Sequence, residues 1–188
     1  NEGEVAAIIA QPYNHGNFFD NAFPIDGFWQ EVRKLCTEKD IVLIIDDVRA
    51  GFRLDLAGSD HFFGFEADII CFCKALANGY NMSAFCGKEF LRSAASSLSY
   101  TGSYWMSAVP FAACIACINK LKAINAPKLF NDLGTELLTG LKKAGAELCM
   151  ECGCCSFNCP ANRPITQTNK LAKAVIREAA IKEKKAQK

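Results

Sequence analysis

The stretch that decides the fold is IVLIID, residues 41–46, an apolar run that ends on an acid. A short run that is apolar on both faces and rich in β-branched residues is typical of a strand inside a parallel sheet. Residues 5–10 (VAAIIA) have the same character, and residues 24–39 between the two runs carry apolar side chains at helical spacing. A strand, a helix and a strand within about 40 residues predict a βαβ unit and therefore a parallel sheet.

The same pattern continues in looser form toward the C-terminus. Residues 67–73 (ADIICFC) and 81–86 (NMSAFC) are apolar runs of strand length. Helical patterns follow at residues 108–122, 128–144 and 164–188. We therefore expect an α/β fold with a mostly parallel sheet, flanking helices and a short helical tail.

The composition indicates a folded protein and excludes several functional classes. Of the 188 residues, 51% are hydrophobic and 11% aromatic, which is too apolar for a disordered chain. The net charge is +1, so we expect no nucleic-acid binding, although eight basic and two acidic residues from Pro160 onward mark a composition break near residue 150. No apolar run approaches the roughly 20 residues of a membrane span, and no signal segment opens the chain. We expect a cytoplasmic protein without a membrane span.

Two charged residues follow predicted strands directly. Asp46 ends the run IVLIID, and Lys74 follows DIICFC. Ligands of parallel α/β sheets bind at the carboxyl ends of the strands, so these residues are candidates for chemistry. The two could form an ion pair that caps the sheet. They also match what pyridoxal 5'-phosphate requires, which is an amine for a Schiff base and an acid beside the ring nitrogen.

Three stretches resemble consecutive blocks of the class III pyridoxal-phosphate aminotransferases. They are LIIDDVRAGFR (residues 43–53), DIICFCKALANGY (residues 68–80) and SYTGSYWMSAVPFAA (residues 99–113). The resemblance covers about residues 1–145 and is nearest to the glutamate-1-semialdehyde aminomutase branch. It implies part of the large domain of a type I pyridoxal-phosphate transferase over residues 1–124, and a helix at residues 125–146 that leads toward a small domain. It also implies a fragment, because the family's phosphate loop precedes the segment that matches this chain.

The resemblance implies a role for four residues. Lys74 would hold the cofactor and move the substrate proton, and Asp46 would hold the ring nitrogen. Val48 would pack on the ring, although it could equally be ordinary core. Thr101 would reach the phosphate of the neighbouring subunit, which implies a homodimer, although a helix-capping role is the alternative. The implied reaction transfers an amino group from a small-molecule donor to a keto or aldehyde acceptor.

The tail at residues 147–188 contains a separate motif. Cys149, Cys152, Cys155 and Cys159 precede a proline in the pattern C-x2-C-x2-C-x3-C-P. This is the spacing of bacterial ferredoxins and predicts ligands of a 4Fe–4S cluster, with zinc as the alternative metal. The segment from Cys149 onward resembles the end of the C subunit of Rnf-type electron-transport complexes. The alternative function is therefore an iron–sulfur electron-transfer module.

Six further cysteines lie in apolar segments of the predicted sheet domain. Free cysteines in such segments are usually small buried hydrophobic residues. We expect that role for Cys36, Cys71, Cys73, Cys86, Cys114 and Cys117.

Overall fold

The computed structural model describes residues 3–15, 22–100, 102–103, 105–161 and 163–186. The chain divides into two compact units, and the boundary between them lies within one helix, at Leu129 and Phe130. The domain boundaries expected from the sequence stay a prediction.

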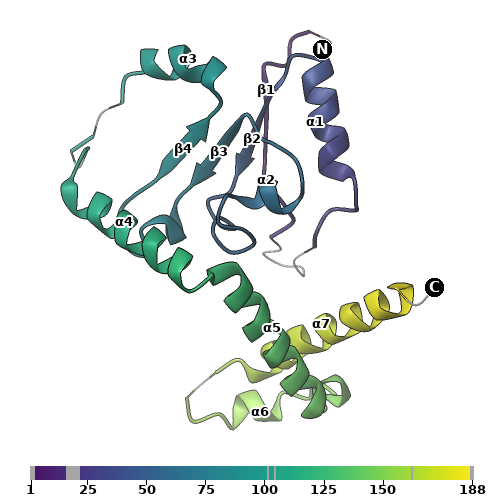
Figure 1. The fold of residues 1–188 in the computed structure, drawn as a ribbon. Coiled ribbons are helices and arrows are strands. Elements are labelled where there is room, and N and C mark those ends of the chain that lie inside the picture. The colour runs from purple at the N-terminus through teal and green to yellow at the C-terminus, as the bar shows by residue number, and fades with distance from the viewer. Residues whose placement is uncertain (1–2, 16–21, 101, 104, 162, 187–188) are drawn as a thin grey trace. The chain divides into compact units, whose positions relative to one another are not determined.

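A four-stranded sheet forms the centre of the first unit (Figure 1). Its strands are β1 (Ala7–Ala10), β2 (Val42–Asp46), β3 (Ile69–Phe72) and β4 (Ala84–Gly87), in the order β1-β2-β3-β4. The first three are parallel, which confirms the mostly parallel sheet. β4 is antiparallel to β3, because the connection between them is too short for a crossover helix.

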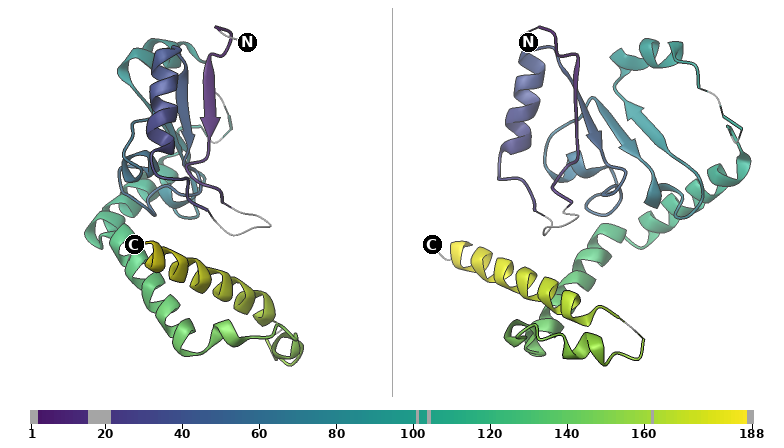
Figure 2. Two further views of the ribbon diagram at one scale, coloured as in Figure 1. Left: turned by 90° about the vertical axis from the view of Figure 1, so that its right-hand side faces the viewer. Right: turned by 180° about the vertical axis from the view of Figure 1, so that it is seen from behind.

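Helix α1 (Phe28–Glu38) covers one face of this sheet (Figure 2). Burial alternates along β2, so that Leu43 and Ile45 are fully buried while their neighbours are partly exposed. These two side chains pack with Trp29 and Cys36 of α1 into one core cluster. Trp29 also donates a hydrogen bond from Nε1 to the carbonyl oxygen of Pro12, at 2.8 Å, and thereby fixes the loop that follows β1.

A second core cluster lies where the chain leaves β3. Phe52, Phe72 and Leu76 form this cluster, and Ile118 and Leu121 of helix α4 (Ala108–Ala123) pack against it. Leu76 belongs to the short 3-10 helix η1 (Lys74–Leu76). The cluster therefore supports the segment that begins with Lys74.

The prediction for the six cysteines of this unit is wrong in part. Cys36 is buried, but Cys86 is exposed, and the remaining four are only partly buried: Cys71, Cys73, Cys114 and Cys117. The reason is that the second face of the sheet and most of α4 are open to solvent within this chain. Ile9 on that face is 65% exposed, and α4 has no fully buried residue among those described.

The sequence did not predict the short helices of this unit. They are α2 (Ser59–Phe62), η1 (Lys74–Leu76), η2 (Glu89–Leu91) and α3 (Arg92–Ser97). Each has fewer than two full turns, so its sequence shows no helical periodicity.

The second unit is helical. Its elements are α5 (Ala126–Lys143), which begins in the first unit, η3 (Ala146–Leu148), α6 (Cys154–Phe157) and α7 (Ile165–Ala186). Polar contacts join the cysteine-rich loop to α7, since Ser156 and Thr166 share a 2.9 Å hydroxyl contact and Lys173 donates to the Cys149 carbonyl at 2.7 Å. No single helix in the described ranges is long and apolar enough to cross a membrane. Taken together, α4 and α5 have the required length and apolar composition, but the chain bends between them.

Candidate functional site

The structure places Asp46 and Lys74 at the same edge of the sheet. Asp46 is the last residue of β2 and pairs in register with Cys71 of the parallel strand β3. Lys74 follows three residues after Cys71 and opens η1. Parallel strands end at one edge, so the acid and the amine belong to neighbouring strand ends, as the sequence predicts.

Lys74 has an unusual backbone conformation. Its φ is 37°, in the region that side chains with a β-carbon rarely adopt. Strained positions of this kind cluster at functional sites, where the surrounding structure maintains them. Its side chain is exposed in the structure. Asp46 and Lys74, both described, form no ion pair, and the capping-pair alternative is therefore not supported.

Two neighbouring acids have different environments. Asp46 is partly buried, and its Oδ1 accepts a hydrogen bond from the Val48 backbone N–H at 3.2 Å. Asp47 is fully buried and accepts hydrogen bonds from the Ser59 hydroxyl at 2.6 Å and the Ser59 backbone N–H at 2.9 Å. Burial raises the pKa of Asp47, even though the Ser59 hydrogen bonds act in the opposite direction. Asp47 is thus part of the scaffold, while Asp46 remains at the edge of the sheet.

The loop after β1 adds residues that sequence reasoning missed. Its Tyr13 and His15 rings lie 4.1 Å apart, and Arg49 donates a hydrogen bond from Nη1 to the His15 carbonyl oxygen at 3.0 Å. Burial and the charge of Arg49 lower the pKa of His15; Asp46 acts in the opposite direction, and Lys74 also lowers the pKa. The imidazole is therefore within electrostatic reach of both predicted site residues. The signal in the sequence was the parallel pairing of β1 with β2, which brings the ends of both strands to one edge.

Thr101 lies outside the described residues. Val48 lies in the turn after Asp46 and is partly buried. Its burial is compatible both with packing on a cofactor ring and with a place in the core.

The predicted metal site does not form among the described residues. No group of three or more His, Cys, Asp or Glu side chains is arranged to hold a metal ion in the described ranges. The cysteine side chains have other neighbours: Asn169 donates to Cys149 Sγ at 3.8 Å, and Cys155 Sγ lies 3.6 Å from the Thr166 hydroxyl. The four predicted ligands therefore do not converge.

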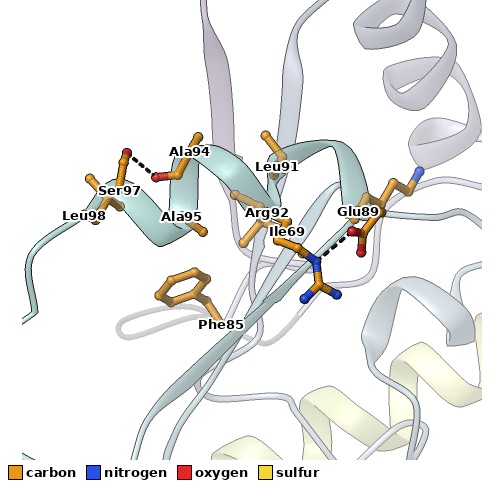
Figure 3. A pocket seen from close by; sticks show the side chains of 11 residues that line it. Ile69, Phe85, Glu89, Leu91, Arg92, Ala94, Ala95, Ser97 and Leu98 are labelled. Carbon is orange, nitrogen blue, oxygen red and sulfur yellow. Dashed lines mark hydrogen bonds and ion pairs between the residues drawn. The ribbon is translucent and has the colours of Figure 1, made fainter.

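A pocket of about 480 Å³ lies at the opposite edge of the sheet from Asp46 and Lys74 (Figure 3). Phe85, Leu91 and Leu98 contribute to its mostly apolar wall. It also contains Ile69, which begins β3, whereas Lys74 lies beyond the other end of that strand. The pocket is therefore separate from the candidate site.

Comparison with known proteins identifies a family for most of the chain. The model of the family Aminotransferase class-III matches residues 1–150 and so ends before Cys152. Aminopentol aminotransferase of Sphingopyxis macrogoltabida is 38% identical over 141 residues, which are 75% of this chain and 33% of that protein. 3-Aminobutyryl-CoA aminotransferase of Cloacimonas acidaminovorans is 39% identical over 89 residues, 47% of this chain and 22% of that protein. The chain thus spans about a third or less of these curated relatives.

Solved structures agree with this assignment. The FumI protein of Sphingopyxis sp. MTA144, in its PLP internal aldimine form, matches with a TM-score of 0.72 and 38% identity over 76% of this chain and 34% of that chain. Acetylornithine aminotransferase of Elizabethkingia anophelis has a TM-score of 0.66 at 20% identity, over 76% of this chain and 37% of that chain. The second likeness concerns the fold alone.

Proposed function

This chain belongs to the class-III aminotransferase family, and on that premise we propose that it forms the cofactor-binding centre of a pyridoxal-phosphate-dependent aminotransferase. The observation that carries the proposal is the position of Asp46 and Lys74 at the ends of neighbouring parallel strands. A second observation supports it, since the buried Nε2 of His15, a residue whose pKa is raised by Asp46 and lowered by Lys74, has no hydrogen-bond partner among the described residues. Such an unpaired buried nitrogen fits a site that a bound group completes.

The residues present fit the cofactor's requirements. When bound, pyridoxal phosphate supplies an aldehyde that links to a lysine amine and a ring that accepts electrons from the substrate's α-carbon. Lys74 is exposed and would provide the amine that holds the cofactor, and its Nζ would also be the group that moves the substrate's α-proton. The Asp46 carboxylate would hold the protonated ring nitrogen, and Val48 would contact the ring.

The proposal also covers the substrates and the assembly of the whole protein. The amino group would pass from a small-molecule donor to a keto or aldehyde acceptor. We place the protein in the cytoplasm and expect a homodimer in which Thr101 contacts the partner's cofactor. The family resemblance supports the homodimer, whereas the cytoplasmic location and the nearness to the aminomutase branch stay predictions.

Covalent labelling tests the proposal. The chain is incubated with pyridoxal phosphate, reduced with borohydride and digested, and the modified lysine is identified by mass spectrometry. We expect the label at Lys74 and its loss in Lys74→Ala. Lys34→Ala, which removes an exposed lysine on α1, should leave the label unchanged. Equal labelling of the two variants would contradict the proposal.

The electron-transfer alternative is less well supported. It depends on the spacing of four cysteines, and the described residues do not bring their sulfur atoms together. We therefore derive no electron-transfer step from the tail.

A further inference from the structure

His15 is a buried histidine with an unsatisfied ring nitrogen. Its side chain is only 4% exposed, and Nε2 is buried without a hydrogen-bond partner in the described part of the chain. Buried polar atoms are nearly always paired, because removing them from water without a partner destabilises the fold. A purely structural role therefore does not explain why a histidine occupies this position.

Two loops fix His15 at the sheet edge where Asp46 lies. β1 runs parallel to β2 with Ala10 opposite Ile45, so β1 ends level with the residue before Asp46 and its loop begins there. The Arg49 side chain, from the turn after β2, donates to the His15 carbonyl oxygen. The backbone of the preceding residue, Asn14, exchanges two hydrogen bonds with Ala22, at 2.9 and 3.0 Å. The position of His15 is thus set by both ends of its loop and by the neighbouring turn.

The charges around His15 favour a neutral imidazole. Burial, then Arg49, Arg53 and Lys74, lower its pKa, while Asp46 raises it. The other titratable neighbour is the Tyr13 phenol, whose own pKa is raised by burial. A neutral imidazole has one N–H to donate and adds no cation beside the lysine.

The Asp46 carboxylate has room for a second hydrogen bond. The Val48 backbone N–H binds Oδ1, and Oδ2 has no hydrogen-bond partner within the described ranges. A carboxylate that holds a ring nitrogen must keep one orientation, and a hydrogen bond from a buried donor restricts its rotation. His15 is a suitable donor because Nε2 has no competing partner among the described residues.

We propose that His15 is a positioning residue of the cofactor site, which holds Asp46 against the ring nitrogen through a hydrogen bond from Nε2 that forms when the ring is bound. The inference rests on the proposed function, because it requires pyridoxal phosphate beside Asp46. It adds a residue that the strand-end pair alone does not indicate.

The chain has only two histidines, so nuclear magnetic resonance of the imidazole nitrogens can test the proposal on the full chain. His61, which is exposed and contacts Asp55 Oδ2 at 2.8 Å, is the internal control. Without cofactor, Asp46→Asn should lower the pKa of His15, because the variant removes the carboxylate that raises it. With pyridoxal phosphate bound, the His15 nitrogen signals should shift and those of His61 should not.

Substitutions separate positioning from folding. His15→Phe keeps a ring against Tyr13 but removes both nitrogens, and should weaken pyridoxal phosphate binding about fivefold, the effect of one hydrogen bond. His15→Gln, which retains a donor, should restore part of that loss, and His61→Phe should have no effect. Trp29 fluorescence during urea unfolding confirms that each variant is folded.

The outcomes distinguish this inference from the proposed function. If Lys74 is labelled but the His15 signals do not respond to cofactor, or His15→Phe binds it as tightly as the wild type, the inference is wrong and the function stands. If Asp46→Asn leaves the pKa of His15 unchanged, the inference is wrong whether or not cofactor binds. Failure to label Lys74 contradicts both.

Discussion

The sheet unit and the cysteine tail each contain a sequence motif of known chemistry, but only the sheet unit positions its motif. Asp46 and Lys74 are 28 residues apart in sequence, yet the parallel register of β2 and β3 brings them to one edge. Four tail cysteines lie within eleven residues, yet their sulfur atoms do not converge in the described structure. Closeness in sequence is therefore a poorer guide to a site than a fixed backbone between its residues.

The difference has a physical cause. In the sheet, backbone hydrogen bonds and the buried side chains of β2 fix the strand ends before any ligand binds. In the tail, α6 has only four residues, and polar contacts such as that between Ser156 and Thr166 hold it on α7. Metal sites without such a scaffold generally form only together with the metal.

The largest expected effect is the complete absence of an iron–sulfur cluster in the tail. After anaerobic incubation with ferrous iron and sulfide, we expect no absorbance that dithionite bleaches, because a single motif lacks the second set of cysteines with which paired motifs exchange ligands. Alkylation followed by mass spectrometry should find Cys149, Cys152, Cys155 and Cys159 still reactive. A stable cluster, lost in Cys155→Ser, would contradict this expectation and make the tail an electron-transfer module.

In the sheet unit, the largest expected loss of stability comes from Asp68. Its carboxylate accepts hydrogen bonds from Arg33 at 2.6 Å and the Leu43 backbone N–H at 2.8 Å, and lies 3.3 Å from Lys88 Nζ. Asp68→Ala leaves the buried Leu43 N–H without its acceptor and removes the carboxylate that Arg33 and Lys88 share, so it should reduce the free energy of unfolding by about 3 kcal/mol. Urea unfolding followed by tryptophan fluorescence, to which the buried Trp29 contributes, measures the change.

Asp55→Ala is the matched control, because Asp55 pairs with the exposed His61, and it should cost about 1 kcal/mol or less. The pH dependence gives a second check. Burial raises the pKa of Asp68, but hydrogen bonds from Leu43 and Arg33 outweigh it, so that the net pKa is below the usual 3.8. The contribution of Asp68 is therefore complete above pH 3.8 and lost as the pH falls below it. If Asp68→Ala and Asp55→Ala reduce the free energy of unfolding equally, the buried contacts of Asp68 stabilise the fold no more than an exposed ion pair does.

The sequence predicted the sheet and its strand ends because both depend on local patterns. IVLIID and DIICFC are apolar runs that end on a charge, and parallel pairing then determines where Asp46 and Lys74 lie. The pairing of β1 with β2 indicated which edge the loop of His15 reaches, but the position of the His15 ring could not be predicted, because it depends on Tyr13 and on Arg49 of another loop. The partial exposure of the cysteines was also missed, since apolar segments do not reveal which face of a sheet is covered.

Two glycine substitutions, one in each unit, compare how tightly the sheet unit and the helical unit are packed, with expected stability changes of intermediate size. A β-carbon at Gly51 would lie 2.8 Å from both the Asp47 carbonyl oxygen and a Phe72 ring carbon, so Gly51→Ala should destabilise the sheet unit by about 2 kcal/mol. Gly134 in α5 has no atom within 4 Å of such a carbon, and Gly134→Ala should stabilise that helix by about 1 kcal/mol. Thermal unfolding by circular dichroism measures both. Destabilisation by Gly134→Ala would show that α5 is more closely packed than the structure indicates.

The smallest expected effect tests the buried acid beside the candidate site. Because burial raises the pKa of Asp47, the folded chain binds more protons than the unfolded chain above pH 3.8, and stability falls as the pH rises through the raised pKa. Asp47→Asn removes this titration and keeps a polar partner for Ser59, so it should change the stability at pH 7 by about 1 kcal/mol or less. It should also flatten the stability curve above about pH 4, where Asp68 no longer titrates. The exposed Asp26→Asn should leave the slope unchanged. If Asp47→Asn keeps the wild-type slope, Asp47 does not titrate in the scaffold, and the contrast between the two adjacent acids is lost.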